Sequence, residues 1–262
     1  MLTELHEDKT TPLVEPTERP FPDTETPAPI SRATLARVAG VLYLVVAVLG
    51  GFSQLYVRSS VVLPGDATAT AQNIRSAATL FRLGFVADLV SITAFLLVAL
   101  VLYVLFEPVS RRLALAMVVF NAVSVAILSV NHINHAGALF AATSAGYTTV
   151  AGTSDSAAQV MLFLDLHSQG YLIAEVFFGL WLLPLGYLAF KSGYFPRSLG
   201  VLLMVGAASY LVDVTATLLV PGAGKEVSLI LATPAAIAEV AFLLWLVAKG
   251  AKTPEKRALN PA

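Results

Sequence analysis

The 262-residue sequence contains no cysteine and few charged residues. Without cysteine, disulfide bonds, thiolate metal sites, cysteine nucleophiles and c-type haem attachment are all excluded. Charged residues make up 13% of the chain and hydrophobic residues 57%, whereas soluble domains have about 25% and about 45–50%. The formal net charge of -1 gives no indication of nucleic-acid binding. These proportions, with a mean hydropathy of +0.78, indicate a protein that crosses a membrane several times.

Several common functional motifs are also missing. The sequence has no phosphate-binding glycine loop, no G-x-S-x-G motif and no H-E-x-x-H motif. It shows no convincing internal repeat, so an inverted-repeat transporter is not predicted.

The chain begins with an acidic, proline-rich segment. Met1–Ile30 holds seven acidic residues, two basic residues and six prolines, and it contains no apolar run. It lacks the basic start and apolar centre of a secretory signal. A segment of this composition cannot bury enough apolar surface to offset the entropy lost on ordering. Residues 1–31 are therefore predicted to form a disordered cytoplasmic tail.

Six apolar segments are long enough to span a bilayer as helices, which takes about 20 residues each. None has the pattern of a strand, and helices satisfy their own backbone hydrogen bonds in lipid. The sequence predicts an all-α polytopic membrane protein, a bundle of six transmembrane helices within residues 32–250. A short amphipathic helix capped by Asp66 is expected before the second span, and a connection of small and polar residues at about 136–155. The expected spans are about 33–56, 79–106, 112–134, 160–190, 197–220 and 227–248.

Basic residues are distributed unevenly about these spans. If the N-terminus is inside, ten lie on the cytoplasmic side: Arg32, Arg37, Arg111, Arg112, Lys191, Arg197, Lys249, Lys252, Lys256 and Arg257. Four lie on the outer side: Arg58, Arg75, Arg82 and Lys225. This bias predicts that both termini, including a tail at 251–262, are cytoplasmic.

Polar and ionisable residues inside the spans are the candidate functional residues, because charge at membrane depth is costly. In the expected orientation nearly all of them fall between the midplane and the outer surface. They predict one outward-facing pocket that binds or conducts a small ligand, an ion or a proton, with Arg82 as counter-ion. The alternative is structural pairing between helices. The candidates are Arg82, Asp88, Asp165, His167, Gln169, Glu175, Asp213 and Glu239.

Three histidines form a second candidate site. His132 and His135 are three residues apart and share a helix face, and His167 lies on the next span. Three histidines with an open position can hold a catalytic divalent metal such as zinc. A carboxylate acting as general base on metal-bound water would then give a hydrolase of lipids. The alternative is that these histidines bind water or lipid headgroups. The candidate carboxylates are Asp88, Asp165 and Glu175.

Small residues within the spans predict close helix packing, as is common in membranes. The glycines concerned are Gly40, Gly50, Gly51, Gly179, Gly186, Gly200 and Gly206.

Four segments resemble a known family. They are Arg37-Val-Ala-Gly40 with Tyr43, Leu166–Tyr171, Phe177–Tyr187 and Lys191–Gly200. They look like the bacterial membrane proteins grouped as domain of unknown function 4386, and the likeness covers about Arg32 to Lys249. The resemblance implies a multi-pass helical protein of the bacterial cytoplasmic (inner) membrane. It implies no particular activity.

Three functions remain open on these grounds. The first is a non-enzymatic protein that binds or conducts a small ligand, ion or proton through the polar pocket. The second is a metal-dependent intramembrane hydrolase of a lipid substrate. The third is a structural or accessory subunit without a site. The clustering of polar residues in the outer half of the spans favours the first, with the lipid bilayer as the immediate partner of the chain.

Overall fold

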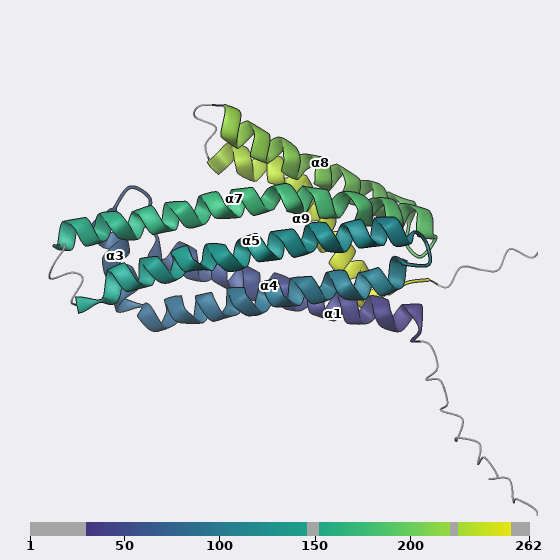
Figure 1. The fold of residues 1–262 in the computed structure, drawn as a ribbon, viewed down its shortest axis with the longest axis horizontal. Helices are drawn as coiled ribbons and strands as arrows, with labels where there is room; N and C mark the ends of the chain where they lie inside the picture. The colour runs from purple at the N-terminus through teal and green to yellow at the C-terminus, as the bar shows by residue number, and fades with distance from the viewer. Residues whose placement is uncertain (1–29, 146–151, 221–224, 253–262) are drawn as a thin grey trace, which may run out of the picture. The chain divides into compact units, whose positions relative to one another are not determined.

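The computed structural model describes residues 30–145, 152–220 and 225–252 (Figure 1). Helices make up almost all of these residues, and no strand occurs among them. Nearly all of the two predicted tails, 1–31 and 251–262, lies outside the described residues. Six of the helices are long and apolar enough to cross a membrane. The prediction of an all-α chain with six candidate membrane spans is therefore confirmed.

The first span, Arg32–Val61, is one continuous run that includes a short π-helix, and α3 follows it before the second span. Asp66 caps α3 as expected, because its carboxylate accepts a hydrogen bond of 2.8 Å from the backbone N–H of Ala69. The elements are α1 Arg32–Gly51, η1 Phe52–Val57, α2 Arg58–Val61, α3 Ala67–Ser76, α4 Ala78–Phe106, α5 Arg111–Thr143, α7 Thr153–Ser192, α8 Arg197–Leu219 and α9 Lys225–Ala248.

Three spans are longer than the sequence predicted, and the first of them continues to Val61 instead of about 56. Helix α5 continues to Thr143, beyond the expected end at 134, and α7 begins at Thr153 instead of 160. The expected connection at 136–155 is therefore wrong at both of its ends. Its small residues pack one helix against another instead of forming a loop, since Ala138, Ala141 and Ala142 are buried together with Ala157 of α7.

The spans pack in chain order around a ring. Helix α1 packs on α4, α4 on α5, α5 on α7, α7 on α8 and α8 on α9, and α9 returns to α1 (Figure 1). Glycines allow the closest of these approaches. A Cβ atom at Gly40 would lie 2.9 Å from the backbone nitrogen of Val247, and one at Gly186 would lie 2.8 Å from the carbonyl oxygen of Gly200. The ring therefore depends on positions where no side chain fits.

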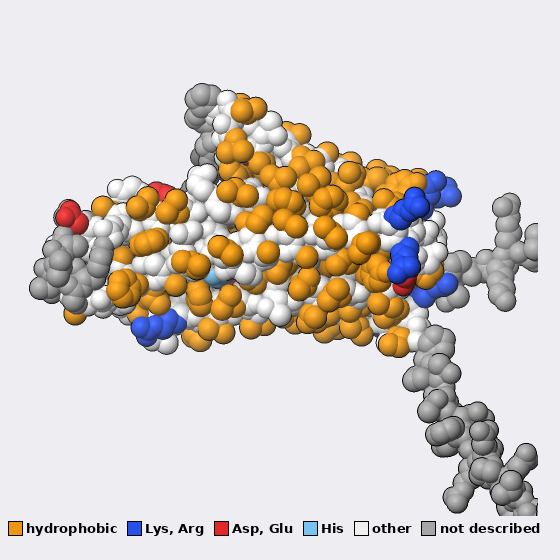
Figure 2. Space-filling view, in the orientation of Figure 1, with side chains coloured by type: hydrophobic (Ala, Val, Ile, Leu, Met, Phe, Trp, Pro, Cys, Tyr) orange, Lys and Arg blue, Asp and Glu red, His pale blue; other side chains and the backbone are white. Residues whose placement is uncertain are grey.

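The surface of the bundle is largely apolar. Hydrophobic side chains cover much of the face in Figure 2, and Lys and Arg gather at one end of it. Leu55 is 78% exposed and Ile230 71%. A continuous apolar surface of this kind is unfavourable in water and is typical of contact with lipid. We call the end where α1 begins and α9 ends the basic end; its cations include Arg32, Lys191 and Lys249.

The half of the bundle nearer the basic end is filled by large apolar side chains. Trp181, Phe106, Phe242 and Leu185 are fully buried there in a single cluster. The polar groups of the spans lie further from the basic end, so the bundle has an apolar half and a polar half. This division follows from the sequence, in which most ionisable residues inside the spans lie in the half away from the basic end, while Glu239 lies close to the middle of α9.

Candidate functional site

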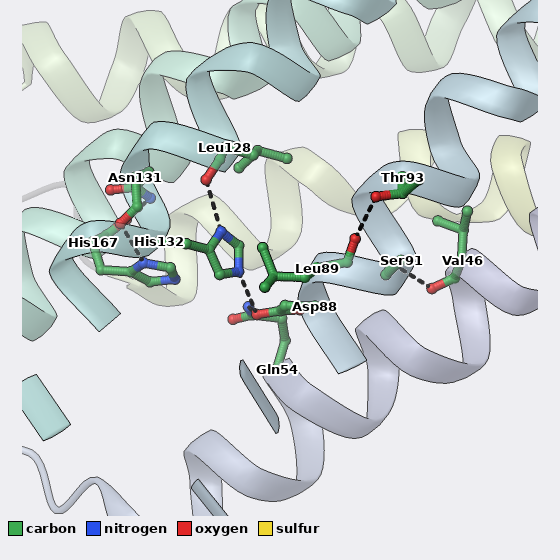
Figure 3. Close-up of polar contacts among 10 residues, drawn as sticks. All are labelled: Val46, Gln54, Asp88, Leu89, Ser91, Thr93, Leu128, Asn131, His132 and His167. Atoms are coloured by element: carbon green, nitrogen blue, oxygen red, sulfur yellow. Dashed lines mark hydrogen bonds and ion pairs between the residues drawn. The ribbon is translucent and has the colours of Figure 1, made fainter. Parts of the chain in front are cut away.

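The structure distributes five of the eight predicted pocket residues over three places instead of one pocket, and the other three are exposed. Asp88 and the three histidines lie between α4, α5 and α7, and Figure 3 shows part of this cluster. Glu239 lies in a cavity at the centre of the ring. Glu175 and Asp213 line a groove next to that cavity.

The predicted residues of α7 separate according to helix face. Asp165 and Gln169 are exposed, whereas His167 is only 2% exposed. Asp165 and Gln169 are four residues apart and share a face, and His167 is two residues from each, or about 200° around the helix. Asp165 and Gln169 therefore do not line the cavities that receive the other polar residues.

Arg82 is exposed, and it lines a shallow depression on the bundle surface with Phe85 and Phe140. The expected ion pair between Arg82 and an intramembrane carboxylate does not occur among the described residues. Arg58 is the cation that points into the bundle instead. Its guanidinium donates to Ser168 Oγ at 2.7 Å, and it lines a small space beside two of the histidines.

A cavity of about 290 Å³ occupies the centre of the ring, and residues from all six spans line it. Glu239 is the one charged residue of its described lining. The hydroxyl of Tyr43 donates to Glu239 Oε1 at 2.6 Å, and the hydroxyl of Tyr210 donates to Oε2 at 2.7 Å. Both carboxylate oxygens are thus held by phenols from two other helices. Such charge-assisted hydrogen bonds are among the stronger ones in proteins.

Aromatic rings form much of the wall of this central cavity. Phe178 is the centre of the group, because its ring centroid lies 5.9 Å from Phe95, 5.9 Å from Tyr171 and 6.0 Å from Tyr210. Tyr43 continues the group, at 6.3 Å from Phe95. Aromatic faces carry negative electrostatic potential and attract cations, most strongly where water is excluded.

A groove of about 350 Å³ between α7, α8 and α9 adjoins the cavity, and we call it the acidic groove. It shares Tyr171, Phe178 and Tyr210 with the cavity wall, and Glu175 and Asp213 supply its charges. Ser228 and Thr217 hold Asp213, with oxygen–oxygen distances of 2.7 and 3.4 Å. Glu175 is 9% exposed, and its Oε1 has no hydrogen-bond partner among the described residues. The Glu175 carboxyl group also has a side-chain hydrogen bond with Asp213. Two neighbouring carboxyl groups repel each other when both are ionised, so this groove suits a cationic occupant.

Asp88 is the centre of the third group, which we call the Asp–His cluster: Asp88, His132, His135 and His167. Gln54 donates to Asp88 Oδ2 at 2.8 Å, and His132 Nε2 lies 3.4 Å from the same oxygen (Figure 3). The other ring nitrogen of His132 lies 2.7 Å from the carbonyl oxygen of Leu128. His132 is therefore hydrogen-bonded at Nδ1, whereas its Nε2 makes only the 3.4 Å charge contact with Asp88 and has no hydrogen-bond partner among the described residues.

The three histidines do come together, as the sequence suggested. Their ring centroids are 5.6 Å apart for His132 and His167, 5.7 Å for His135 and His167, and 6.2 Å for His132 and His135. Asn131 links the two helices, since its amide donates to the carbonyl oxygen of His167 at 2.8 Å (Figure 3). The Nε2 atoms of His135 and His167 have no hydrogen-bond partner among the described residues.

Two sets of site residues were not anticipated. Gln54 and Arg58 are four residues apart at the end of an apolar span, and this spacing was an available signal for a shared face. The π-helix Phe52–Val57 carries Gln54, and π-turns often occur at functional sites. The hydroxyl groups of Tyr43 and Tyr210 gave no comparable signal, because tyrosine is also common at membrane interfaces.

Sequence comparison assigns this chain to a family. The sequence model of DUF4386, a domain of unknown function, matches residues 38–250. The chain belongs to the DUF4386 family. The match includes Tyr43, Glu239 and the whole Asp–His cluster, and the resemblance indicated by the four segments is confirmed. An Archaeoglobus fulgidus relative described as an uncharacterized protein is 32% identical over 158 residues, which cover 60% of this DUF4386 chain and 78% of the relative. No solved structure matches the chain.

The hydrogen bonds from Tyr43 and Tyr210 to Glu239 in this DUF4386 protein give a first prediction. Replacing Tyr210 by phenylalanine removes one donor and leaves Glu239 Oε2 without its phenol. Leaving a partly buried charged acceptor unsatisfied costs about 1–3 kcal/mol, so the free energy of unfolding should fall by that amount. Unfolding of the purified protein in detergent, followed by circular dichroism, measures it.

The matched control is a double-mutant cycle with Glu239→Gln. The loss caused by Tyr210→Phe should shrink when Glu239 is already replaced, because the two residues act on one hydrogen bond. Equal losses in both backgrounds would show that the hydroxyl of Tyr210 stabilises the protein through some other contact.

Proposed function

We propose that this membrane protein binds a small organic cation in the central cavity, with Glu239 as the counter-charge. The observation that carries the proposal is a carboxylate held by two tyrosines inside an aromatic-walled cavity whose described lining contains no Lys or Arg. A cage of aromatic rings with a carboxylate is a known arrangement for binding quaternary ammonium groups.

The composition of the lining favours an organic cation over a metal ion. Hard cations such as Ca²⁺ take six to eight oxygen ligands. The central cavity offers the Glu239 carboxylate and a few hydroxyls, and the rest of its lining is mainly apolar. Its volume of about 290 Å³ is near the lower limit of ligand pockets, about 300 Å³. The ligand class is therefore a small amine or quaternary ammonium compound with apolar substituents.

The acidic groove supports a route into the cavity. Its two carboxylates come from α7 and α8, and it shares three aromatic residues with the cavity wall. A cation in the groove would first meet Glu175 and Asp213 and would then reach Glu239 by passing the rings of Tyr171, Phe178 and Tyr210. Negative charge along such a path raises the local concentration of cations.

The positive-inside rule supports an orientation for this route. We place the basic end in the cytoplasm, with both ends of the transmembrane domain on that side of a bacterial cytoplasmic membrane. The acidic groove and the Asp–His cluster then lie in the outer half of the bundle, and the ligand approaches from outside.

A lipid hydrolase finds less support in the geometry. The space beside His135 and His167 is about 10 Å³, which is near the minimum for one water molecule. A lipid ester cannot reach these histidines without a large rearrangement of the elements that line this space, η1, α2, α4, α5 and α7. The Asp–His cluster therefore does not supply the substrate site that this reaction needs.

The binding proposal can be tested with choline and its uncharged isostere, 3,3-dimethylbutan-1-ol. The chain has two tryptophans, so Trp245→Phe leaves Trp181 as the single reporter. The Trp181 ring lies 4.9 Å from Phe95 and 6.3 Å from Tyr43, both in the cavity wall. Choline chloride should change the emission of Trp181 in a saturable way, and the alcohol should bind at least tenfold more weakly.

Sodium chloride at matched ionic strength is the control for non-specific salt effects. No saturable response to choline, or an equal response to the alcohol, would contradict the proposal. The second of these results would indicate an apolar cavity that does not sense charge. The first would favour a structural or accessory role for the protein.

A further inference from the structure

We infer that Asp88, His135 and His167 form a binding site for a divalent transition-metal ion between α4, α5 and α7. One possible ligand atom from each residue lies within 4.8 Å of the other two. Their side chains are 5%, 7% and 2% exposed. This site is separate from the central cavity and does not depend on the binding of organic cations there.

Two unpartnered nitrogen atoms point to a ligand. The Nε2 atoms of His135 and His167 are buried and have no hydrogen-bond partner among the described residues. Buried polar atoms without a partner are rare in native proteins, and here two of them from different helices lie beside the same carboxylate. A metal ion bound by both nitrogens and by Asp88 would satisfy all three groups at once.

The surroundings hold these rings as metal sites usually do. A ligating histidine commonly donates its second N–H to a backbone carbonyl or a carboxylate. Nδ1 of His167 lies 3.4 Å from the carbonyl oxygen of Asn131, and His135 has a backbone hydrogen-bonding partner in Phe81. Gln54 orients the Asp88 carboxylate through its hydrogen bond of 2.8 Å. Each ligand thus has a second contact that fixes its direction.

Metal binding requires the ligand atoms of Asp88, His135 and His167 to move slightly closer to one another. In a tetrahedral zinc site the bonds are about 2.0–2.1 Å, so neighbouring ligand atoms are about 3.3 Å apart. The atoms here must therefore approach by at most about 1.5 Å, which side-chain rotation can supply. Nitrogen ligands with one carboxylate suit zinc, cobalt or nickel better than calcium or magnesium.

The inferred metal ligands differ from the three histidines that the sequence predicted. His132 is hydrogen-bonded to Leu128 through Nδ1, and its Nε2 lies 3.4 Å from Asp88 Oδ2 without a hydrogen bond. The group of side chains whose possible ligand atoms lie together is Asp88, His135 and His167, so we assign His132 to the support of the carboxylate. The space of about 10 Å³ beside His135 and His167 has room for one water as a fourth ligand. Arg58 also lines that space, and its charge opposes a cation there. Its guanidinium is directed to Ser168 Oγ and the carbonyl oxygen of Leu164, and Asp88 supplies a compensating negative charge.

Cobalt binding to the full-length protein in detergent tests the site without any variant. Tetrahedral Co²⁺ gives an intense visible absorption and octahedral Co²⁺ a weak one. One equivalent of Co²⁺ with the intense spectrum, displaced by one equivalent of Zn²⁺, is the expected result. A weak spectrum, a variable stoichiometry or no binding would overturn the inference, because surface groups bind Co²⁺ octahedrally with water.

Variants then assign the ligands. His135→Gln, His167→Gln and Asp88→Asn should each abolish the intense Co²⁺ spectrum. His132→Gln, the matched control, should keep the spectrum and lose about 10–100-fold in affinity, as is typical of groups that orient a ligand. Circular dichroism and gel filtration verify that each variant is folded. If His132→Gln abolishes the spectrum while His135→Gln preserves it, the assignment is wrong.

Discussion

Replacing Glu239 by glutamine should weaken choline binding by about 10–1000-fold and leave the bundle folded. The substitution keeps the shape of the side chain and removes its charge. Tyrosine hydroxyls accept as well as donate, so Tyr43 or Tyr210 can turn to receive a hydrogen bond from the new amide. The free energy of unfolding should therefore change much less than the binding free energy does.

The size of the binding loss follows from electrostatics. Two unit charges 4 Å apart attract by about 4 kcal/mol at an effective dielectric constant of 20. The cation–aromatic contacts that remain contribute about 0.5–2 kcal/mol. Because each 1.4 kcal/mol is a factor of ten, a decrease in choline affinity of about 10–1000-fold is expected. The Trp181 emission of the Trp245→Phe protein measures it.

The matched control is Glu107→Gln. Glu107 pairs with Arg111 at 3.4 Å at the basic end and lies outside the cavity and the groove. Its replacement should leave choline affinity unchanged. If Glu239→Gln keeps full affinity while Glu175→Gln or Asp213→Asn loses it, the cation is held in the acidic groove and Glu239 has only a structural role.

The fold was largely predictable because length and apolarity determine which segments can span a bilayer. The ends of the helices were less predictable than their existence, and α5 and α7 show the reason. Their facing ends are rich in alanine and threonine, which resemble a loop in composition but allow close helix packing. The π-helix at Phe52–Val57 has no sequence pattern of its own, and it brings Gln54 to Asp88.

The candidate site was predictable in its residue types but only partly in its geometry. Helical spacing within α7 could have separated His167 from Asp165 and Gln169. No local pattern links Glu239 to Tyr43, which is 196 residues away in the sequence. The spacing of Gln54 and Arg58 indicates a shared face but not its direction, and Arg58 and Arg82 each lie at the end of a span away from the basic end. Which of them turns inward depends on how the helices rotate in the ring.

The half of the bundle near the basic end provides close packing, and the other half contains the candidate sites. Near the basic end, α7 and α8 approach at glycines and pack large apolar groups such as Trp181 and Leu203. Farther from the basic end, α8 places Tyr210 in the wall of both the cavity and the groove, and Asp213 in the groove. The close contact at one end therefore sets the position of the site residues on the same helix.

Replacing Gly200 by alanine should be one of the most destabilising small changes in the chain. The added Cβ would lie 2.6 Å from the backbone nitrogen of Phe190 and 2.7 Å from the carbonyl oxygen of Gly186. Backbone atoms of a helix cannot move aside as a side chain can, so α8 must shift away from α7. Overpacking of this kind costs about 1–3 kcal/mol, which should appear as a lower free energy of unfolding in detergent.

Gly51→Ala is the matched control for this change. Gly51 is also helical, and a Cβ there would meet nothing within 4 Å. The same added methyl group should therefore cost no stability at Gly51, since alanine is the better helix former. Because Tyr210 lies on α8, the folded fraction of Gly200→Ala should also bind choline more weakly, whereas Gly51→Ala should bind it normally. Equal stability of the two variants would mean that α7 and α8 are not held together at this glycine contact.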